Sequence, residues 1–306
     1  MRKSKSSSVI TEHVNARSVG LENLSAREIL RLINDEDRKV ADVVRREIPS
    51  IERAVTIIIS HLKKGGRLIY IGAGTSGRLA VLDASELWPT FGVGPQTVRA
   101  VIAGGPRAVM RSAEGAEDRY SGGAKALKNI GVSKEDVVMG ISASGRTPFV
   151  LGALRYAKKR HSVTIALTSN PHSSISTLAN ITICPKTGTE IIMGSTRMKA
   201  GTAQKLVLNM ISTVTMLKLG RTYGTLMVNV QPISEKLIKR ATRIVAMTTG
   251  LNQKEAENRL KKAHLNVPVA ILMIKSKLTF RQATRLLRTT RGSLQAAIAL
   301  ANSRVG

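Results

Sequence analysis

Two small groups of carboxylates stand out in a chain that has only 20 Asp and Glu among its 306 residues. Asp83 and Glu86 are spaced i, i+3 in "LDASE", which places them on one face of a helix. Glu114, Glu117 and Asp118 follow in "AEGAED". Partly buried carboxylates can remove a proton from carbon beside a carbonyl and protonate a leaving oxygen. Helix capping and surface salt bridges would explain the same spacing, and the residues alone leave both interpretations open.

A glycine-rich loop precedes the first of these groups, in "RLIYIGAGTSGRLAVLDASE" (67–86). Gly72, Gly74 and Gly77 match the G-x-G-x-x-G pattern of dinucleotide-binding proteins. Such a site also needs an acidic residue roughly 20 residues later to bind the ribose hydroxyls. The chain has no Asp or Glu between Glu86 and Glu114. We therefore do not expect a nicotinamide or flavin cofactor.

Hydroxyl side chains occupy this loop and a second loop like it. Thr75 and Ser76 stand where a helix would begin, and free backbone N–H groups at a helix N-terminus favour an anion. The segment "ISASGRTP" (141–148) places Ser142, Ser144 and Thr147 at a second strand-to-helix turn. Both loops contain Ser-Gly-Arg, and neither has a Walker A lysine. Together they predict a site for a sugar phosphate or a similar monophosphate.

The composition excludes several classes of site. Cys184 is the only cysteine, so an intramolecular disulfide is impossible and a cysteine-based metal cluster is not expected. The five histidines show no H-x-x-x-H spacing. Aromatic residues make up only 3% of the chain, which argues against a stacking platform for single-stranded nucleic acid. We expect neither a metal nor an organic cofactor.

The formal net charge of +28 has two interpretations. It could serve nucleic-acid binding, or it could be spread over solvated faces and merely favour phosphorylated substrates. Residues 240–306 hold 13 Lys and Arg against two acids, yet no nucleic-acid motif accompanies them, so we do not expect a nucleic-acid partner. The apolar stretches are too short to span a bilayer, and "MRKSKSSSVITEHVN" has no apolar signal region. We expect a cytoplasmic protein without a membrane partner.

The elements that must position these residues form an α/β pattern. Apolar runs bounded by turn residues alternate with helical stretches, which predicts a parallel five-stranded sheet flanked by helices. The five runs are 67–72, 96–104, 136–142, 163–169 and 180–185. Residues 25–64 read as helices, with Ser25 and Glu28 forming a capping box. A long amphipathic helix is predicted over 195–220, ending at Gly220.

The C-terminal stretch carries an internal repeat of 27 residues. The offset aligns Leu251 with Leu278 and Leu260 with Leu287, and each copy opens with a predicted capping box, Asn252/Glu255 and Thr279/Gln282. The repeat predicts a duplicated pair of short helices, with a role in packing or dimer support. We therefore expect a main domain over residues 1–240 and a small helical domain over residues 241–306.

Several long motifs, in order, make the chain recognisable. They are "LINDEDRKVADVV", "GGRLIYIGAGTSGRLAVLDASE", "PTFGVGP", "IAGG", "EGAED", "DVVMGISASGRTPFVLGALRYA", "GSTRMKAGTAQKLVLNMISTVTM" and "YGTLMVNV". Over residues 10–230 the chain closely resembles the N-acetylmuramic acid 6-phosphate etherases, which have the sugar isomerase (SIS) fold, as do the glucokinase regulatory proteins. The C-terminal helices resemble that family's ubiquitin-associated-like tail.

The resemblance implies removal of D-lactate from N-acetylmuramic acid 6-phosphate, by elimination and then water addition, without a metal or nucleotide. The family's two catalytic glutamates match Glu86 and Glu117. Glu86 would protonate the leaving ether oxygen and Glu117 would be the second acid/base, while the choice between them for the C2 proton stays open. Proteins of this kind commonly form homodimers in which both chains border the site.

The same resemblance implies that the hydroxyl loops bind phosphate and sugar hydroxyls. The residues concerned are Thr75, Ser76, Ser142, Ser144 and Thr147. In "GSTRMKAGT", Ser195, Arg197 and Lys199 would lie near the site and supply a counter-charge for the phosphate or the lactyl carboxylate. A solvated helix N-terminus is the alternative explanation of Arg197 and Lys199.

The chain departs from the family pattern beside the first glutamate. Leu87, Trp88 and Pro89 stand where the family usually has Cys-Pro-Pro, and "SNP" (169–171) replaces Cys-Asn-Pro. Three other functions remain: a non-catalytic sugar-phosphate sensor, an aldose–ketose isomerase and a nucleic-acid-associated protein. A pure sensor would not need both Glu86 and Glu117.

Overall fold

The computed structural model describes residues 9–303. Residues 1–8, which include part of the stretch without a signal region, lie outside the described residues. The chain divides into two compact units: Met1–Ala84 with Pro95–Ile211, and Ser85–Gly94 with Ser212–Gly306. This division falls after Ile211, whereas the sequence predicted a boundary after residue 240, and the second unit also takes a short piece from the middle of the chain.

The first unit is built on the predicted parallel sheet. Its strands are β1 (Leu68–Gly72), β2 (Val98–Ile102), β3 (Val137–Ile141), β4 (Val163–Leu167) and β5 (Ile181–Ile183). They are ordered β2-β1-β3-β4-β5, and all neighbouring pairs are parallel. All five predicted strands are confirmed, and each observed strand is shorter than the apolar run that predicted it.

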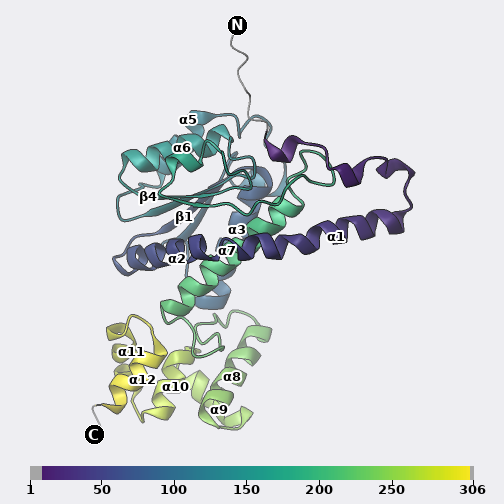
Figure 1. Cartoon of the computed structure of the whole chain (residues 1–306). Helices are drawn as coiled ribbons and strands as arrows, with labels where there is room; N and C mark the ends of the chain where they lie inside the picture. Colours follow the sequence, from purple (N-terminus) through teal and green to yellow (C-terminus); the bar gives the residue numbers. More distant parts are fainter. Residues whose placement is uncertain (1–8, 304–306) are drawn as a thin grey trace. The chain divides into compact units, whose positions relative to one another are not determined.

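Helices cover both faces of this sheet (Figure 1). On one face lie α5 (Tyr120–Asn129) and α6 (Pro148–Lys159), and on the other lies α2 (Ile48–Lys63). The core under α5 and α6 joins strand residues such as Ile69 and Val138 to helix residues such as Leu127 and Leu154. Burial on both faces explains why the strands are near-continuous apolar runs rather than alternating ones.

The chain enters the sheet through short 3₁₀ turns and two helices. The turns are η1 (Ile10–Glu12), η2 (Ala16–Ser18) and η3 (Leu21–Asn23), and α1 (Ala26–Arg45) leads into α2. The Ser25 hydroxyl accepts from the Glu28 N–H, and the Glu28 carboxylate accepts from the Ser25 N–H, so the predicted capping box is confirmed.

The remaining helices of the sheet region follow the strands. They are α3 (Gly74–Phe91), α4 (Arg107–Met110), η4 (Ser176–Leu178) and α7 (Lys199–Lys218). The prediction started α7 at residue 195, but the helix begins four residues later. In between, the N–H of Ser195 bonds to the Ile192 carbonyl and that of Met198 to the Ser195 carbonyl, which forms turns instead of a helix.

The second unit contains α8 (Glu235–Thr249) and the predicted repeat of helix pairs. The pairs are α9 (Gln253–Lys262) with α10 (Val267–Lys275), and α11 (Phe280–Thr289) with α12 (Leu294–Asn302). The reciprocal capping box is present at Thr279/Gln282. At Asn252 only half of it forms, because the side chain accepts from the Glu255 N–H and no return bond is made; the prediction of a full box there is wrong.

Across the described residues 9–303, no helix is both long enough and apolar enough to cross a membrane.

Candidate active site at the junction of two strand-to-helix turns

The order of the strands creates a crevice between β1 and β3. After β1 the chain passes through α3 to β2 on one side, and after β3 it passes through α6 to β4 on the other. The carboxyl ends of β1 and β3 lie side by side, with Gly72 paired to Ile141. In open parallel sheets, ligands bind at the carboxyl ends of strands where the strand order reverses in this way.

A polar cavity of about 360 Å³ lies at this crevice, and we call it the hydroxyl pocket. Its lining brings together both predicted hydroxyl loops and one of the two predicted glutamates. The lining residues are Glu12, Ala73, Gly74, Thr75, Ser76, Glu117, Asp118, Ser142, Ala143, Ser144, Arg146, Thr147, Pro148, Gly194 and Thr196.

The first loop is shaped by close packing of α3 against the sheet. A Cβ atom on Gly77 would lie 2.6 Å from Ile102 Cγ1 and 2.9 Å from the Gly72 carbonyl oxygen, so only glycine fits there. The helix therefore starts directly at the strand end, with Thr75 and the buried Ser76 in its first turn. N–H groups of a first helical turn have no carbonyl partner within the helix, and they carry partial positive charge.

The second loop is organised around the hydroxyl of Ser142, which is buried. Its Oγ lies 2.8 Å from Thr147 Oγ1 and 3.5 Å from Ser144 Oγ, and it accepts from the Gly145 N–H at 3.0 Å. The Ser144 hydroxyl accepts from the Arg146 N–H at 3.3 Å. Three hydroxyls are thus gathered at the N-terminus of α6, where an anion is favoured.

The loop that follows β4 forms backbone hydrogen bonds to the second hydroxyl loop. The N–H of Ile175 donates to the Gly145 carbonyl at 3.0 Å, and the N–H of Ser169 donates to the Ala143 carbonyl at 3.0 Å. Gly145 has a φ of +66°, and a Cβ there would lie 2.1 Å from Ser173 Cβ. The hydroxyl loop is therefore fixed by its backbone before any ligand arrives.

Glu117 lies on the lining of the hydroxyl pocket with its side chain exposed. Its backbone is tied to the start of α6, because the Phe149 N–H donates to the Glu117 carbonyl at 2.9 Å. The sequence predicts a partly buried carboxylate, but the side chain of Glu117 is open to solvent in the single chain. Glu86 is likewise exposed, in α3, and it does not line the hydroxyl pocket.

Lys199 does not line the pocket. Its side chain is 4% exposed, and its Nζ lies 2.5 Å from Glu36 Oε2. Glu36 also bonds Arg17 at 3.0 Å and contacts Lys39. The ammonium group is thus part of a buried ion-pair network, which corrects the expectation of a counter-charge for the ligand. Burial acts to raise the pKa of Glu36, but hydrogen bonds from Lys199, Lys39 and Arg17 outweigh it and lower that pKa to about 2.

The other residues of "GSTRMKAGT" lie in the turns before α7 and in its first turn. Glu190 accepts the backbone N–H groups of Lys199 at 3.0 Å and Ala200 at 2.9 Å, so a fully buried carboxylate occupies the helix N-terminus. Burial raises the pKa of Glu190. Arg197 is exposed and Ser195 half-buried, and neither lines the hydroxyl pocket. The motif contributes Thr196 and Gly194 to the pocket instead.

Asp118 of the second carboxylate group also lines the pocket, whereas three other polar lining residues were missed in the sequence: Glu12, Arg146 and Thr196. Arg146 and Thr196 stand next to residues already singled out, so their motifs could have indicated them. Glu12 comes from η1, far away in the chain, and it lies beside Gly194, whose N–H bonds to the Thr11 carbonyl at 3.0 Å. Nothing in the local sequence marks Glu12. Within residues 9–303, no three His, Cys, Asp or Glu side chains gather as a metal site.

Comparison with known proteins matches two family models. Residues 50–158 match the glucokinase regulatory protein N-terminal SIS domain, and residues 123–214 match the SIS domain. A solved phosphoheptose isomerase from Francisella tularensis is 19% identical, with a TM-score of 0.48, over 62% of this chain and 100% of that chain.

Curated relatives match over almost the whole chain. An N-acetylmuramic acid 6-phosphate etherase of Caldanaerobacter subterraneus subsp. tengcongensis is 49% identical over 292 residues, covering 95% of each chain. One of Clostridium beijerinckii is 46% identical, covering 94% of this chain and 95% of the relative. The chain therefore belongs to the N-acetylmuramic acid 6-phosphate etherase family.

Proposed function

We propose that this protein is a carbon–oxygen lyase that converts N-acetylmuramic acid 6-phosphate into N-acetylglucosamine 6-phosphate and D-lactate. The full-length similarity to etherases at 49% identity is the observation that carries the proposal. The hydroxyl pocket supports it, because its two loops offer hydroxyl and N–H groups to a phosphosugar and it also contains a carboxylate.

Substrate binding is assigned to the two helix N-termini. Thr75 and Ser76 on α3, and Ser144 and Thr147 beside α6, bind the phosphate and sugar hydroxyls, with Ser142 as the buried hub of the second group. Hydroxyl and backbone N–H donors suit phosphate oxygens, and the positive ends of two helix dipoles add a favourable field. Arg197 and Ser195 remain proposed contacts at the edge of the site.

The chemistry follows from the substrate in its open-chain form. The C1 aldehyde acidifies the C2 proton, one carboxylate removes it, and the lactyl group leaves C3 with a proton donated to its ether oxygen. Water then adds to the unsaturated aldehyde, placing a hydroxyl on C3 and a proton back on C2. Glu86 is assigned to the leaving oxygen and Glu117 to the second acid/base role. The net reaction consumes one water and needs no redox step.

The proposed working form is a homodimer in the cytoplasm. Both proposed acid/base residues are exposed in the single chain, whereas acid/base catalysis near neutral pH favours carboxylates shielded from water. A second copy bordering the site would supply that shielding. The substrate is a charged phosphosugar, which is retained inside cells, and neither a membrane nor a nucleic acid is part of the proposal.

An assay of lactate release tests this function. Purified protein incubated with N-acetylmuramic acid 6-phosphate is expected to release D-lactate in proportion to the sugar consumed. Binding of the sugar phosphate without lactate release would instead indicate a non-catalytic sensor of the same fold.

A further inference from the structure

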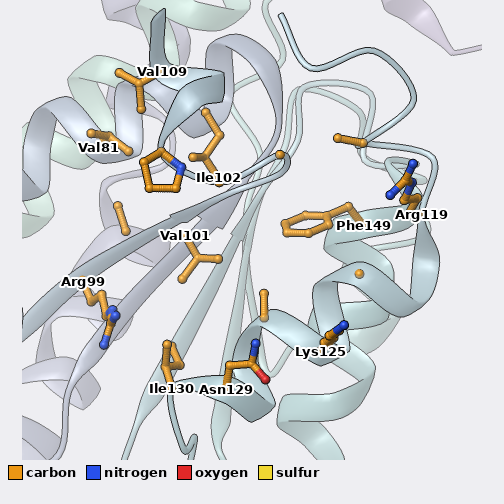
Figure 2. A pocket seen from close by; sticks show the side chains of 17 residues that line it. Val81, Arg99, Val101, Ile102, Val109, Arg119, Lys125, Asn129, Ile130 and Phe149 are labelled. Atoms are coloured by element: carbon orange, nitrogen blue, oxygen red, sulfur yellow. The ribbon is translucent and has the colours of Figure 1, made fainter. Parts of the chain in front are cut away.

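A second cavity, of about 640 Å³, lies against the edge of the sheet, and we call it the β2-edge cavity. Its floor is formed by Val101 and Ile102 of β2 together with the ring of Phe149, as Figure 2 shows. Val81 of α3 and Val109 of α4 line one side, and Ile130, which directly follows α5, lines the other. Among the described residues 9–303, β2 pairs only with β1, so no further described strand lies on its outer side.

The β2-edge cavity is separate from the hydroxyl pocket. The two cavities have no lining residue in common. Residues adjacent in sequence line the two cavities in two segments. In residues 116–119, Ala116 and Arg119 line the β2-edge cavity while Glu117 and Asp118 line the hydroxyl pocket. In residues 148–149, Phe149 lines the β2-edge cavity and Pro148 the hydroxyl pocket. A ligand in one cavity therefore need not compete directly with a ligand in the other.

Three cationic side chains are set into this apolar lining. They are Arg99, Arg119 and Lys125. Figure 2 shows Arg99 on one side of the cavity and Arg119 and Lys125 on the other. All three are exposed, and none forms an ion pair with another residue of the described chain. No Asp or Glu of the part of the chain that the structure describes lines the cavity. The lining thus combines an apolar surface with positive charge that has no partner.

Such a lining selects one kind of occupant. The volume is in the range that holds a small molecule. Binding an apolar group against the apolar lining is favourable, because it removes apolar surface from water. Uncompensated cations at the rim favour an anionic group that stays close to water. We propose that the β2-edge cavity binds a small amphipathic organic acid, with an apolar ring or short chain on the floor and its acid group at the cations. This inference goes beyond the proposed function and is independent of it.

The probe for the test is the amphipathic anion 8-anilinonaphthalene-1-sulfonate, whose fluorescence rises in apolar surroundings. The full-length protein is expected to bind it saturably at one site per chain. Octanoate is expected to displace the probe, and 1-octanol, which has the same chain length without the charge, is expected to displace it at least fivefold less effectively. Equal displacement by octanoate and octanol would overturn the role given to the cations.

Two matched lysines on α5 locate the site. Lys125 lines the cavity, whereas Lys128, also exposed and one turn further on, does not. Lys125→Glu is expected to weaken probe binding about tenfold, because it replaces attraction by repulsion, and Lys128→Glu by less than twofold. Equal effects of the two variants would mean that the probe is attracted by the overall positive charge of the protein and not bound in the cavity, which would overturn the proposal.

A cavity-filling variant provides the second test. Ala126→Phe places a ring inside the cavity and is expected to abolish probe binding while the variant keeps the parent's circular dichroism spectrum. Unchanged probe binding in that folded variant would contradict the assignment. Displacement of the probe by N-acetylglucosamine 6-phosphate would place it in the hydroxyl pocket, and conversion of a dimer to monomers by Lys125→Glu would make the cavity an interface between chains. Either result would overturn the proposal.

Discussion

The backbone N–H of Phe149 donates a 2.9 Å hydrogen bond to the carbonyl oxygen of Glu117. This bond ties the segment that carries the carboxylate to the first turn of α6, whose N-cap residue is Thr147. The position of Glu117 beside the hydroxyl loop is therefore set by main-chain atoms. Changes to its side chain should alter the chemistry of the pocket without moving the loop.

Glu117→Gln is expected to lower kcat by about 10²–10⁴-fold, which is the range for loss of an acid/base group. Because the side chain is exposed, the melting temperature should change little. Glu114→Gln is the matched control: it removes a carboxylate from the same "AEGAED" segment but does not line the hydroxyl pocket, and it should leave kcat within about twofold. Equal losses in both variants would show that the segment's charge matters and not the particular carboxylate.

Thr75→Val should weaken binding of the phosphosugar about five- to tenfold, because it removes one hydrogen-bonding group at nearly constant shape. The expected change is in KM and in the equilibrium affinity for N-acetylglucosamine 6-phosphate. Thr202→Val on α7, which is exposed and lies outside the pocket, is the control and should leave both unchanged. An unaltered affinity in Thr75→Val would remove that hydroxyl from the site.

Gly145→Ala should destabilise the fold by about 3 kcal/mol or more. The residue has a φ of +66°, which costs about 1–2 kcal/mol for alanine, and the new Cβ would also meet Ser173 Cβ. Gly131→Ala isolates the first cost, because Gly131 has a φ of +62° with open space around it. Chemical denaturation of both variants checks this, and a Gly145→Ala loss no larger than that of Gly131→Ala would show that the loop is not tightly packed.

The parallel sheet and the two hydroxyl loops could be predicted from the sequence because their signals are local. Apolar runs of the right length mark buried strands, and hydroxyl-rich turns after β1 and β3 mark an anion site at the edge where these strand ends meet. Neighbouring positions in the strand order then bring the two loops together without further information.

Lys199 shows what the sequence could not predict. A lysine near a phosphate-binding motif looks like a counter-charge, but its partner Glu36 is 163 residues away in the sequence, and only the tertiary fold brings the two side chains together. Glu12 is the converse case, since a residue from η1 enters the pocket without any local signal. Both depend on tertiary contacts at large sequence separation.

Lys199→Met should therefore destabilise the protein by about 3–5 kcal/mol, because it leaves a buried carboxylate with less charge compensation. Lys205→Met, an exposed lysine on the same helix, should change stability by no more than about 0.5 kcal/mol. Urea unfolding measures both. An unchanged unfolding free energy in Lys199→Met would show that Arg17 and Lys39 alone compensate the charge of Glu36.

The same network predicts how stability depends on pH. The folded-state pKa of Glu36 is about 2, below its usual 4.5, so its charged form stabilises the fold above pH 4.5. That contribution is lost as the pH falls from 4.5 toward 2. The difference in unfolding free energy between the parent and Glu36→Gln should be greatest near neutral pH and shrink across this window. A constant difference would contradict the lowered pKa.

The most direct test of the central claim is to run the reaction in water enriched in the heavy oxygen isotope. Elimination followed by water addition breaks the bond between C3 and the ether oxygen, so the heavy oxygen should appear on C3 of N-acetylglucosamine 6-phosphate, seen as an isotope shift of the C3 carbon signal. The hydroxyl of the released D-lactate should carry none. Heavy oxygen in the lactate hydroxyl, or no lactate at all, would contradict the account.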